Sequence, residues 1–315
     1  MVALAGILLL AGARIAFQTG EVSYFDFDRG IALPSANLWI DSDRLTMIVN
    51  TALILATALS WMLVIQFFNP FRALTTLPAS FFLLMMLSVP DFTDQLYTGT
   101  VLGAVMPLCV ALLWSAFADP GALRRIYLIF VILSALSMTQ YCFAVYIPVF
   151  IVGCFQMKIF SMRTIVAILL GLVTPWWIVF GLGLVSPGDI HLPDSANFFS
   201  GFETDEFVSS MAVIGITVLL LIIGWVASFM NVLTLNANLR AFNGNISLIG
   251  LTTLLAMAID FGNVPSYLPL LMLIASYELS YMFGINKGKR RFIPILAIMA
   301  VYVAIFVNRI FIDAF

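Results

Sequence analysis

The stretch 121-GALRRIYLIFVILSALSMTQYCFAVYIPVFIVGCFQMKIFSMR-163 contains no charged side chain between Arg125 and Lys158. As one helix, residues 126–157 would extend about 48 Å at roughly 1.5 Å per residue. The hydrocarbon core of a bilayer is only about 30 Å thick, so a single span would have to tilt severely. The length of the stretch therefore favours two helices over one.

The charges at the two ends of this stretch give a sharper test. Basic residues precede it and follow it, and because such residues concentrate in cytoplasmic loops, both ends are expected on the cytoplasmic side. The chain must then turn back near its midpoint, where Ser137, Thr139 and Gln140 can hydrogen-bond the loosened backbone. We predict a hairpin of two short helices, 124–138 and 141–156.

The composition excludes a soluble globular domain. Of the 315 residues, 63% are hydrophobic and 10% are charged, and the mean hydropathy is +1.10. Such a chain is typical of a polytopic integral membrane protein. The formal net charge is -2 and the basic residues are scattered in short loops, so no basic stripe is available to bind nucleic acid. We predict a single transmembrane domain over residues 1–315.

The apolar segments and the hairpin together predict an all-α transmembrane bundle of about eleven spans. The predicted spans are 1–17, 45–67, 78–90, 99–117, 124–138, 141–156, 164–185, 207–230, 246–263, 266–285 and 292–311. With the amino terminus in the cytoplasm and the carboxyl terminus outside, the basic loop 286–291 is cytoplasmic and the acidic loops 18–44 and 186–206 are external. If residues 121–163 formed one span, every later loop would lie on the other side of the membrane, and the basic loop 286–291 would be external.

The first segment, residues 1–17, has two interpretations. It lacks a basic region before its apolar run, and the small residues at positions 11–13 also fit a cleavable signal. We favour a retained span, because a polytopic protein needs no cleavage in order to insert. Whether this segment is the true start of the native chain stays open.

The cysteines give no sign of a metal or redox centre. Cys109, Cys142 and Cys154 lie inside apolar runs, without the CxxC spacing or a neighbouring histidine that a metal site needs. We expect them to be packed hydrophobic side chains. The sequence contains no Walker loop, dinucleotide fingerprint or GxSxG elbow, so it supports no soluble-enzyme chemistry, and the cofactor, if any, stays unknown.

Two acidic residues of the first outer loop are the candidate catalytic residues. Asp26 and Asp28 alternate with phenylalanines, so in an extended segment both carboxylates point the same way. Two close carboxylates can bind a divalent ion or share the work of a general base. Arg29, directly after them, is a substrate-binding candidate because a guanidinium pairs with phosphate. The alternative is a solvated loop that carries acids for topological reasons.

Two further outer residues are candidates for substrate binding. His191 is the one histidine of the chain, and it lies between Asp189 and Asp194, a combination that suits proton transfer or metal binding. Asp94 lies in another acidic outer loop and would line the same outer cavity as the first-loop acids. An exposed structural histidine is the alternative interpretation of His191, because no helical HxxxH or HxxE spacing supports a metal.

Glu278 is the intramembrane candidate. It lies inside a predicted span, where an ionisable side chain is expensive and marks a functional site by default. Two structural alternatives remain open: the carboxyl accepts hydrogen bonds from nearby tyrosines, or it reaches toward Lys287 at the helix end. Asp260, at the outer end of its predicted span, is expected to be interfacial and solvated.

Three stretches carry a resemblance to a known family: 74-LTTLPASFFLLMML-87, 118-ADPGALRRIY-127 and 155-FQMKIFSMRTIVAILLGLVTPWWIVFGLG-183. The pattern over about residues 45–290 resembles an uncharacterised family of polytopic inner-membrane proteins of Bacteroidota, a domain of unknown function. The most specific part comprises Lys158, Arg163, Gly171, Pro175, Trp176 and Trp177. This resemblance implies a many-helix fold in the bacterial inner membrane and no particular reaction.

Three classes of function remain. The layout is loosely similar to membrane-embedded glycosyltransferases that use lipid-linked sugars. In those enzymes the first outer loop supplies the catalytic carboxylate, and Asp26 or Asp28 matches that position. This chain departs from their pattern because no large soluble domain follows the last helix. A polyprenyl-linked lipid would then be the substrate. The second class is a transporter or flippase that uses Glu278 and proline-interrupted spans. The third is a non-catalytic subunit with protein partners in an envelope complex.

Overall fold

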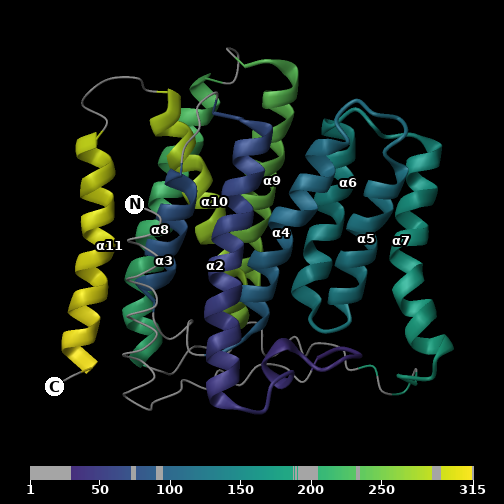
Figure 1. The fold of residues 1–315 in the computed structure, drawn as a ribbon, viewed down its shortest axis with the longest axis horizontal. Helices are drawn as coiled ribbons and strands as arrows, with labels where there is room; N and C mark the ends of the chain where they lie inside the picture. Colours follow the sequence, from purple (N-terminus) through teal and green to yellow (C-terminus); the bar gives the residue numbers. More distant parts are fainter. Residues whose placement is uncertain are drawn as a thin grey trace.

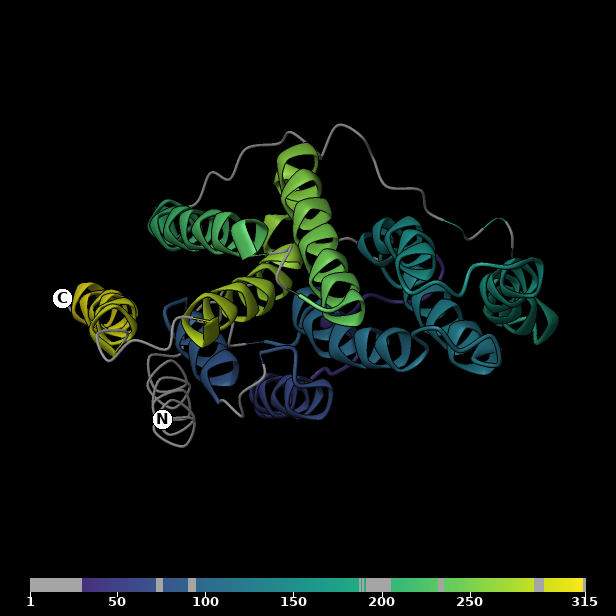
Figure 2. The same ribbon diagram turned by 90° about the horizontal axis from the view of Figure 1, so that it is seen from above.

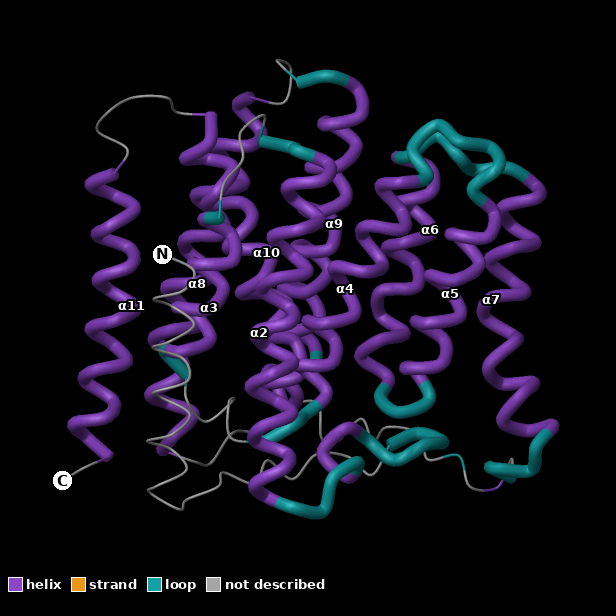
Figure 3. Tube along the Cα trace, in the orientation of Figure 1, coloured by secondary structure: helices purple, strands orange, loops and turns teal. Residues whose placement is uncertain are grey.

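The structure, a computed structural model, describes residues 30–71, 76–89, 95–186, 188, 190, 205–231, 235–285 and 292–313. Regular secondary structure within these ranges is helical throughout, which confirms the all-α prediction. Figure 1 shows the helices standing side by side, with α7 and α11 at opposite edges of the molecule. Figure 3 shows most of the described loops near the two ends of the long helices.

The described α-helices are α2 (Asp43–Phe68), α3 (Leu77–Leu87), α4 (Thr98–Ser115), α5 (Leu123–Ser137), α6 (Ile147–Gln156), α7 (Met162–Gly181), α8 (Asp205–Asn231), α9 (Ala237–Ile259), α10 (Val264–Ile285) and α11 (Phe292–Asp313). Three short 3-10 helices connect or precede them: η1 (Ala36–Leu38), η3 (Tyr141–Tyr146) and η7 (Phe261–Asn263).

Five of the described helices are long and apolar enough to cross a membrane: α2, α4, α7, residues 211–231 of α8, and α9. These helices support a membrane-embedded protein. Five is fewer than the number predicted, so the prediction of about eleven spans is not confirmed within the described residues. Helix α3, for example, has only 11 residues, and it is buried along nearly its whole length by other helices.

The exposed surface of α7 is apolar along one face of the helix. Its exposed side chains include Val166, Leu169, Val173 and Trp177, spaced three to four residues apart and therefore on one face. Trp177 is 77% exposed. A continuous apolar stripe of this kind is unfavourable in water, whereas acyl chains solvate it, so we interpret it as a lipid-facing surface.

The chain turns back between α5 and α6, which confirms two helices rather than one in this stretch. The second α-helix begins at Ile147 instead of residue 141, because residues 141–146 form the 3-10 turn η3. Pro148 occupies the first turn of α6. Proline is tolerated there because the N–H groups of the first turn have no acceptor within the helix. The carbonyl of Met138 accepts hydrogen bonds from the N–H groups of Ala32 (2.8 Å) and Leu33 (3.0 Å), which fix the turn to the loop before η1.

Helix α5 packs most extensively against α7, and a glycine makes this close approach possible. A Cβ atom at Gly171 would lie 2.8 Å from both the Phe130 Cβ and the Tyr127 carbonyl oxygen, too close for any side chain. The Ser134 hydroxyl donates to the carbonyl of Leu172 at 2.6 Å across the same contact. The hairpin is thereby attached to α7 by backbone proximity as well as by apolar packing.

Helix α10 lies at the centre of the bundle. It contacts α3, α4, α8 and α9, and its residues from Tyr267 to Tyr281 are buried on every side. Figure 2, viewed from above, shows α10 between these neighbours. Its serines bond within their own helix: Ser276 Oγ donates to Leu273 O and Ser280 Oγ to Ser276 O, each at 2.6 Å. A polar side chain that has no such local bond must find its partner on another helix.

We expect Gly171→Ala to destabilise the protein by roughly 1–3 kcal/mol, because the added methyl group forces α5 and α7 apart. The matched control is Gly181→Ala in the same helix, since nothing lies within 4 Å of a Cβ atom there. Thermal unfolding of both variants in detergent, relative to the parent, is the measurement. Equal unfolding temperatures for the two variants would contradict the close α5–α7 packing.

Candidate functional site

Glu278 is the one predicted site residue that lies among the described residues, and its side chain is fully buried inside the bundle, with 0% exposed. One carboxyl oxygen, Oε2, accepts a hydrogen bond from the Ser228 hydroxyl of α8 at 2.5 Å. The other, Oε1, accepts from the Ser247 hydroxyl of α9 at 3.1 Å. A single carboxyl group of α10 thus joins three helices, and we refer to Glu278, Ser228 and Ser247 as the carboxyl junction.

A glycine on α8 allows this junction to form. A Cβ atom at Gly224 would lie 2.7 Å from the Glu278 Cβ, so only glycine permits this separation between α8 and α10. Ser228 follows one helical turn later on the same face of α8, which brings its hydroxyl within reach of the carboxyl group. The sequence spacing of Gly224 and Ser228 is therefore part of the site.

The donors at Glu278 differ from those expected from the sequence. One of the two structural alternatives expected tyrosine donors, but the neighbouring Tyr277 donates its hydroxyl to Asn243 Oδ1 at 2.5 Å, and serines bond the carboxyl group. The other alternative, a reach toward Lys287, involves a residue outside the described ranges. Serine hydroxyls suit a carboxyl group in either state, because they donate to a carboxylate and accept from the protonated acid.

The hydrogen-bond partners of Glu278 within the described ranges are these two serines, and no basic side chain there forms an ion pair with it. An ionised carboxylate without a countercharge is strongly disfavoured away from water. The carboxyl group must therefore be neutral, by holding a proton, or be neutralised by a bound cation whenever water is excluded.

Asp260 forms a second buried carboxyl site, directly after the last residue of α9. The prediction that this residue is solvated is wrong, because it is only 5% exposed. Its Oδ2 accepts from the hydroxyls of Tyr141 (2.6 Å) and Tyr267 (3.0 Å), and its Oδ1 accepts from the Asn263 amide at 2.9 Å. These residues come from η3, η7 and α10, and we refer to the four together as the Asp260 cage.

Further polar atoms are buried on the opposite face of α9 from the carboxyl junction. Asn245 is 0% exposed, and neither atom of its amide has a hydrogen-bond partner within the described ranges. A Cβ atom at Gly153 on α6 would lie 3.1 Å from the Asn245 amide nitrogen, so this amide points at the glycine. Such unsatisfied groups typically cost about 1–3 kcal/mol each.

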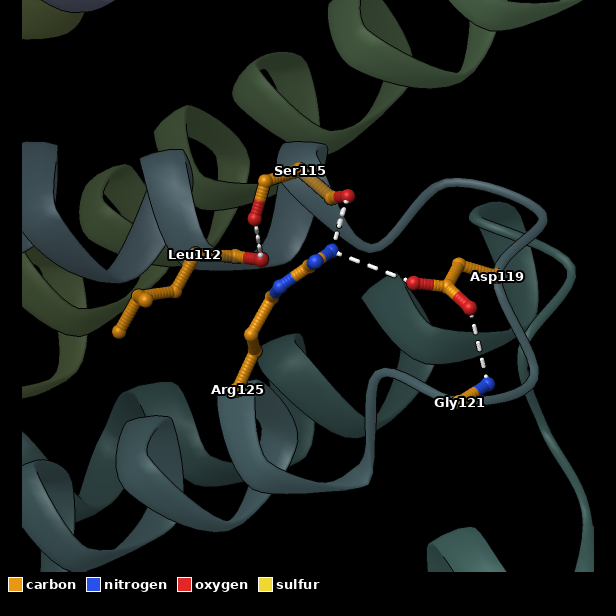
Figure 4. A network of polar contacts seen from close by, with 5 residues as sticks. All are labelled: Leu112, Ser115, Asp119, Gly121 and Arg125. Atoms are coloured by element: carbon orange, nitrogen blue, oxygen red, sulfur yellow. Dashed lines mark hydrogen bonds and ion pairs between the residues drawn. The ribbon is translucent and has the colours of Figure 1, made fainter.

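The turn between α4 and α5 is held by the ion pair (Figure 4). Arg125 Nη1 lies 3.4 Å from Asp119 Oδ2 and donates to the carbonyl of Ser115, the last residue of α4, at 2.5 Å. The Gly121 N–H donates to Asp119 Oδ1 at 2.9 Å. Both charged side chains are more than 40% exposed, so this network orders the turn and contributes little to stability.

The remaining predicted site residues lie outside the described ranges. These are Asp26, Asp28, Arg29, Asp94 and His191. Their proposed roles stay predictions. Among the described residues, no group of three or more histidine, cysteine, aspartate or glutamate side chains could hold a metal ion. Cys109, Cys142 and Cys154 are free and buried, as expected of packed side chains.

Comparison of the chain with protein-family models, with the sequences of curated proteins and with solved structures finds no match. The chemistry of the two carboxyl sites must therefore be inferred from their own geometry.

Proposed function

We propose that this protein is a membrane transporter or flippase in which Glu278 takes up and releases a proton as the helices move. The carboxyl junction supports this function most directly: a carboxyl group lies inside a helical bundle, bonded by two serines and without a basic partner among the described residues. A buried carboxylate that stays ionised is normally paired with a cation. The serines leave both protonation states of Glu278 accessible.

The central helix also contains a point at which it can bend. Pro269 lies within α10, nine residues before Glu278, and its ring removes the hydrogen bond to the Pro265 carbonyl. Gly99 and Gly103 of α4 face this point, with a Gly99 Cβ position only 2.6 Å from the Pro265 carbonyl oxygen. Bending at Pro269 would move the carboxyl junction relative to α4, as alternating access requires. Pro107 and Pro175 interrupt α4 and α7 in the same way.

The basic residues support an orientation in the bacterial inner membrane, with the amino terminus in the cytoplasm, the carboxyl terminus outside and about eleven spans. In this proposal the level of Arg124, Lys158 and Arg240 is cytoplasmic. The turn of the α5–α6 hairpin and the Asp260 cage then lie at the external level.

A second candidate function is chemistry on a polyprenyl-linked glycan of the cell envelope. It is supported by the sequence of the first outer loop, where Asp26 and Asp28 stand two residues apart beside Arg29, and by the loose similarity to membrane-embedded glycosyltransferases. Asp94 and His191 would complete an outer-leaflet site. A third candidate is a non-catalytic subunit, for which the apolar face of α7 would contact a protein partner.

Cysteine labelling tests the orientation. We expect Leu184→Cys to react with a membrane-impermeant maleimide on intact cells stripped of their outer membrane, and Lys158→Cys to react only after permeabilisation. Both positions are exposed, whereas the three native cysteines are buried and should give little background. The opposite labelling pattern would reverse the proposed sides of the membrane.

A hydrophobic carbodiimide tests Glu278, because this reagent enters membranes and modifies protonated carboxyl groups. We expect an adduct on the Glu278 peptide that declines as the pH rises, found by mass spectrometry of the purified protein. Glu278→Gln should fold normally, since the amide preserves the shape, but give no adduct. Exposed Asp119, paired with Arg125, is the internal control and should stay unmodified. Absence of the Glu278 adduct at every pH would make Glu278 a packing residue.

The glycan hypothesis predicts that Asp26→Asn together with Asp28→Asn abolishes glycan transfer without lowering expression, because the amide is isosteric but cannot act as a base. The measurement is the envelope glycan of a strain whose only copy carries both substitutions. An unchanged glycan would remove the enzymatic candidate and leave the transport proposal intact.

A further inference from the structure

Polar side chains recur along α9 over most of its length. They are Asn243, Ser247, Thr253 and Asp260, and the small residue Gly250 lies among them. Between Ser247 and Thr253 this stripe turns by about 120° round the helix, and Gly250, three residues from each, lies between them. From the first to the last, the stripe covers about 25 Å at roughly 1.5 Å per residue, close to the thickness of a hydrocarbon core.

Every member of this stripe is bonded to another element of the bundle. Asn243 accepts from the hydroxyl of Tyr277, and Ser247 donates to Glu278. At the next level, the buried hydroxyls of Thr253 and Tyr146 lie 3.0 Å apart. At the external level, Asp260 accepts from the hydroxyls of the cage. The stripe therefore consists largely of hydroxyl and carboxyl groups, which can both give and receive protons.

Between Ser247 and Thr253, a distance of about 9 Å along the helix, the stripe contains no hydroxyl or carboxyl group. The indole of Trp225 on α8 lies at this level, with its Cζ2 2.9 Å and its Cε2 3.6 Å from a Cβ position at Gly250. Its Nε1, bonded to Cε2, is buried and has no hydrogen-bond partner among the described residues. An indole N–H without a partner is a ready donor to a bound water molecule.

We propose that the stripe is a hydrated proton path that connects the Asp260 cage with Glu278. A proton from external water binds the Asp260 carboxylate, passes through the hydroxyl groups and bound water at the levels of Thr253 and Trp225, and protonates Glu278. Asp260 is then a carboxylate again, and the negative charge of Glu278 is neutralised. This assignment rests on the proposed function, because it requires that Glu278 exchanges a proton.

The groups that face each end of the path are compatible with this role. Around Asp260 these are Tyr141, Tyr267 and, through its electrostatic interaction with the carboxylate, Cys142. Around Glu278 they are Ser228 and Ser247, with Tyr277 and Tyr281 interacting next to them. None of these side chains is basic, so none would fix either carboxyl group as a permanent carboxylate.

The test uses the full-length protein in sealed membrane vesicles whose external face carries Leu184, with a trapped alkaline buffer inside. The external medium is acidified, and the rate of carbodiimide modification of Glu278 is followed by mass spectrometry. In the parent protein we expect this rate to rise soon after external acidification. Thr253→Val and Asp260→Asn should each slow the response about tenfold or more, which corresponds to about 1.4 kcal/mol in the barrier.

Thr217→Val is the matched control. Thr217 is a buried threonine on α8 whose hydroxyl lies 3.0 Å from the hydroxyl of Tyr302, so the substitution removes the same kind of bond away from the stripe. It should leave the response to external acid unchanged. If Asp260→Asn fails to fold, the comparison of Thr253→Val with Thr217→Val still decides the question.

The outcomes separate the path from the proposed function. A slow response in Thr253→Val and a normal one in Thr217→Val support the path. If Thr253→Val responds as fast as the parent, or if Glu278 in the parent responds only to the internal pH, the path is wrong while proton exchange at Glu278 stands. If Glu278 is not modified at any pH in detergent, the proposed function and the path are both wrong.

Discussion

Within a bilayer, every polar group that leaves water must find its partner inside the protein, and the interior of this bundle follows from that constraint. Most hydroxyl groups meet it locally. Thr57, for example, donates to the carbonyl of Leu53 at 2.7 Å, and Thr174 to that of Leu170 at 2.6 Å, each one turn back along its own helix. A carboxylate cannot be satisfied in this way, because it accepts hydrogen bonds and helical N–H groups are already used. Glu278 and Asp260 therefore require donors from other elements, and they determine which helices meet.

Glycine allows the required approach. At Gly224, Gly171 and Gly99, an added Cβ atom would lie less than 3 Å from an atom of the neighbouring helix. Close approach of this kind is favourable between helices in a membrane, where lipid removes the hydrophobic advantage of burying larger side chains. The position of Gly224 opposite Glu278 links packing to chemistry, because the separation that it permits also brings the Ser228 hydroxyl to the carboxyl group.

The sequence predicts some of these features and not others, for identifiable physical reasons. The α5–α6 hairpin follows from charge and length, which are local properties, and so does the recognition of Glu278 as a costly intramembrane group. The donors of Glu278 could not be found, because Ser228 and Ser247 lie 50 and 31 residues away along the chain. Asp260 was assigned to solvent from its place at a helix end, but Tyr141, 119 residues earlier, covers it. Pairing between distant helices decides both sites, and no local pattern specifies that pairing.

The contrast between the surface and the interior of the molecule bears on function. At the α4–α5 turn, Asp119 has a basic partner although water would solvate it at little cost. Inside the bundle, where an unpaired charge is most expensive, Glu278 and Asp260 have hydroxyl and amide partners and no basic one among the described residues. If stability alone governed these positions, an apolar side chain would do as well or better, since even a buried ion pair is often no more stable than apolar packing. Two buried carboxyl groups, one bonded near the middle of α9 and one directly after its last residue, support the proposed uptake and release of a proton in the interior.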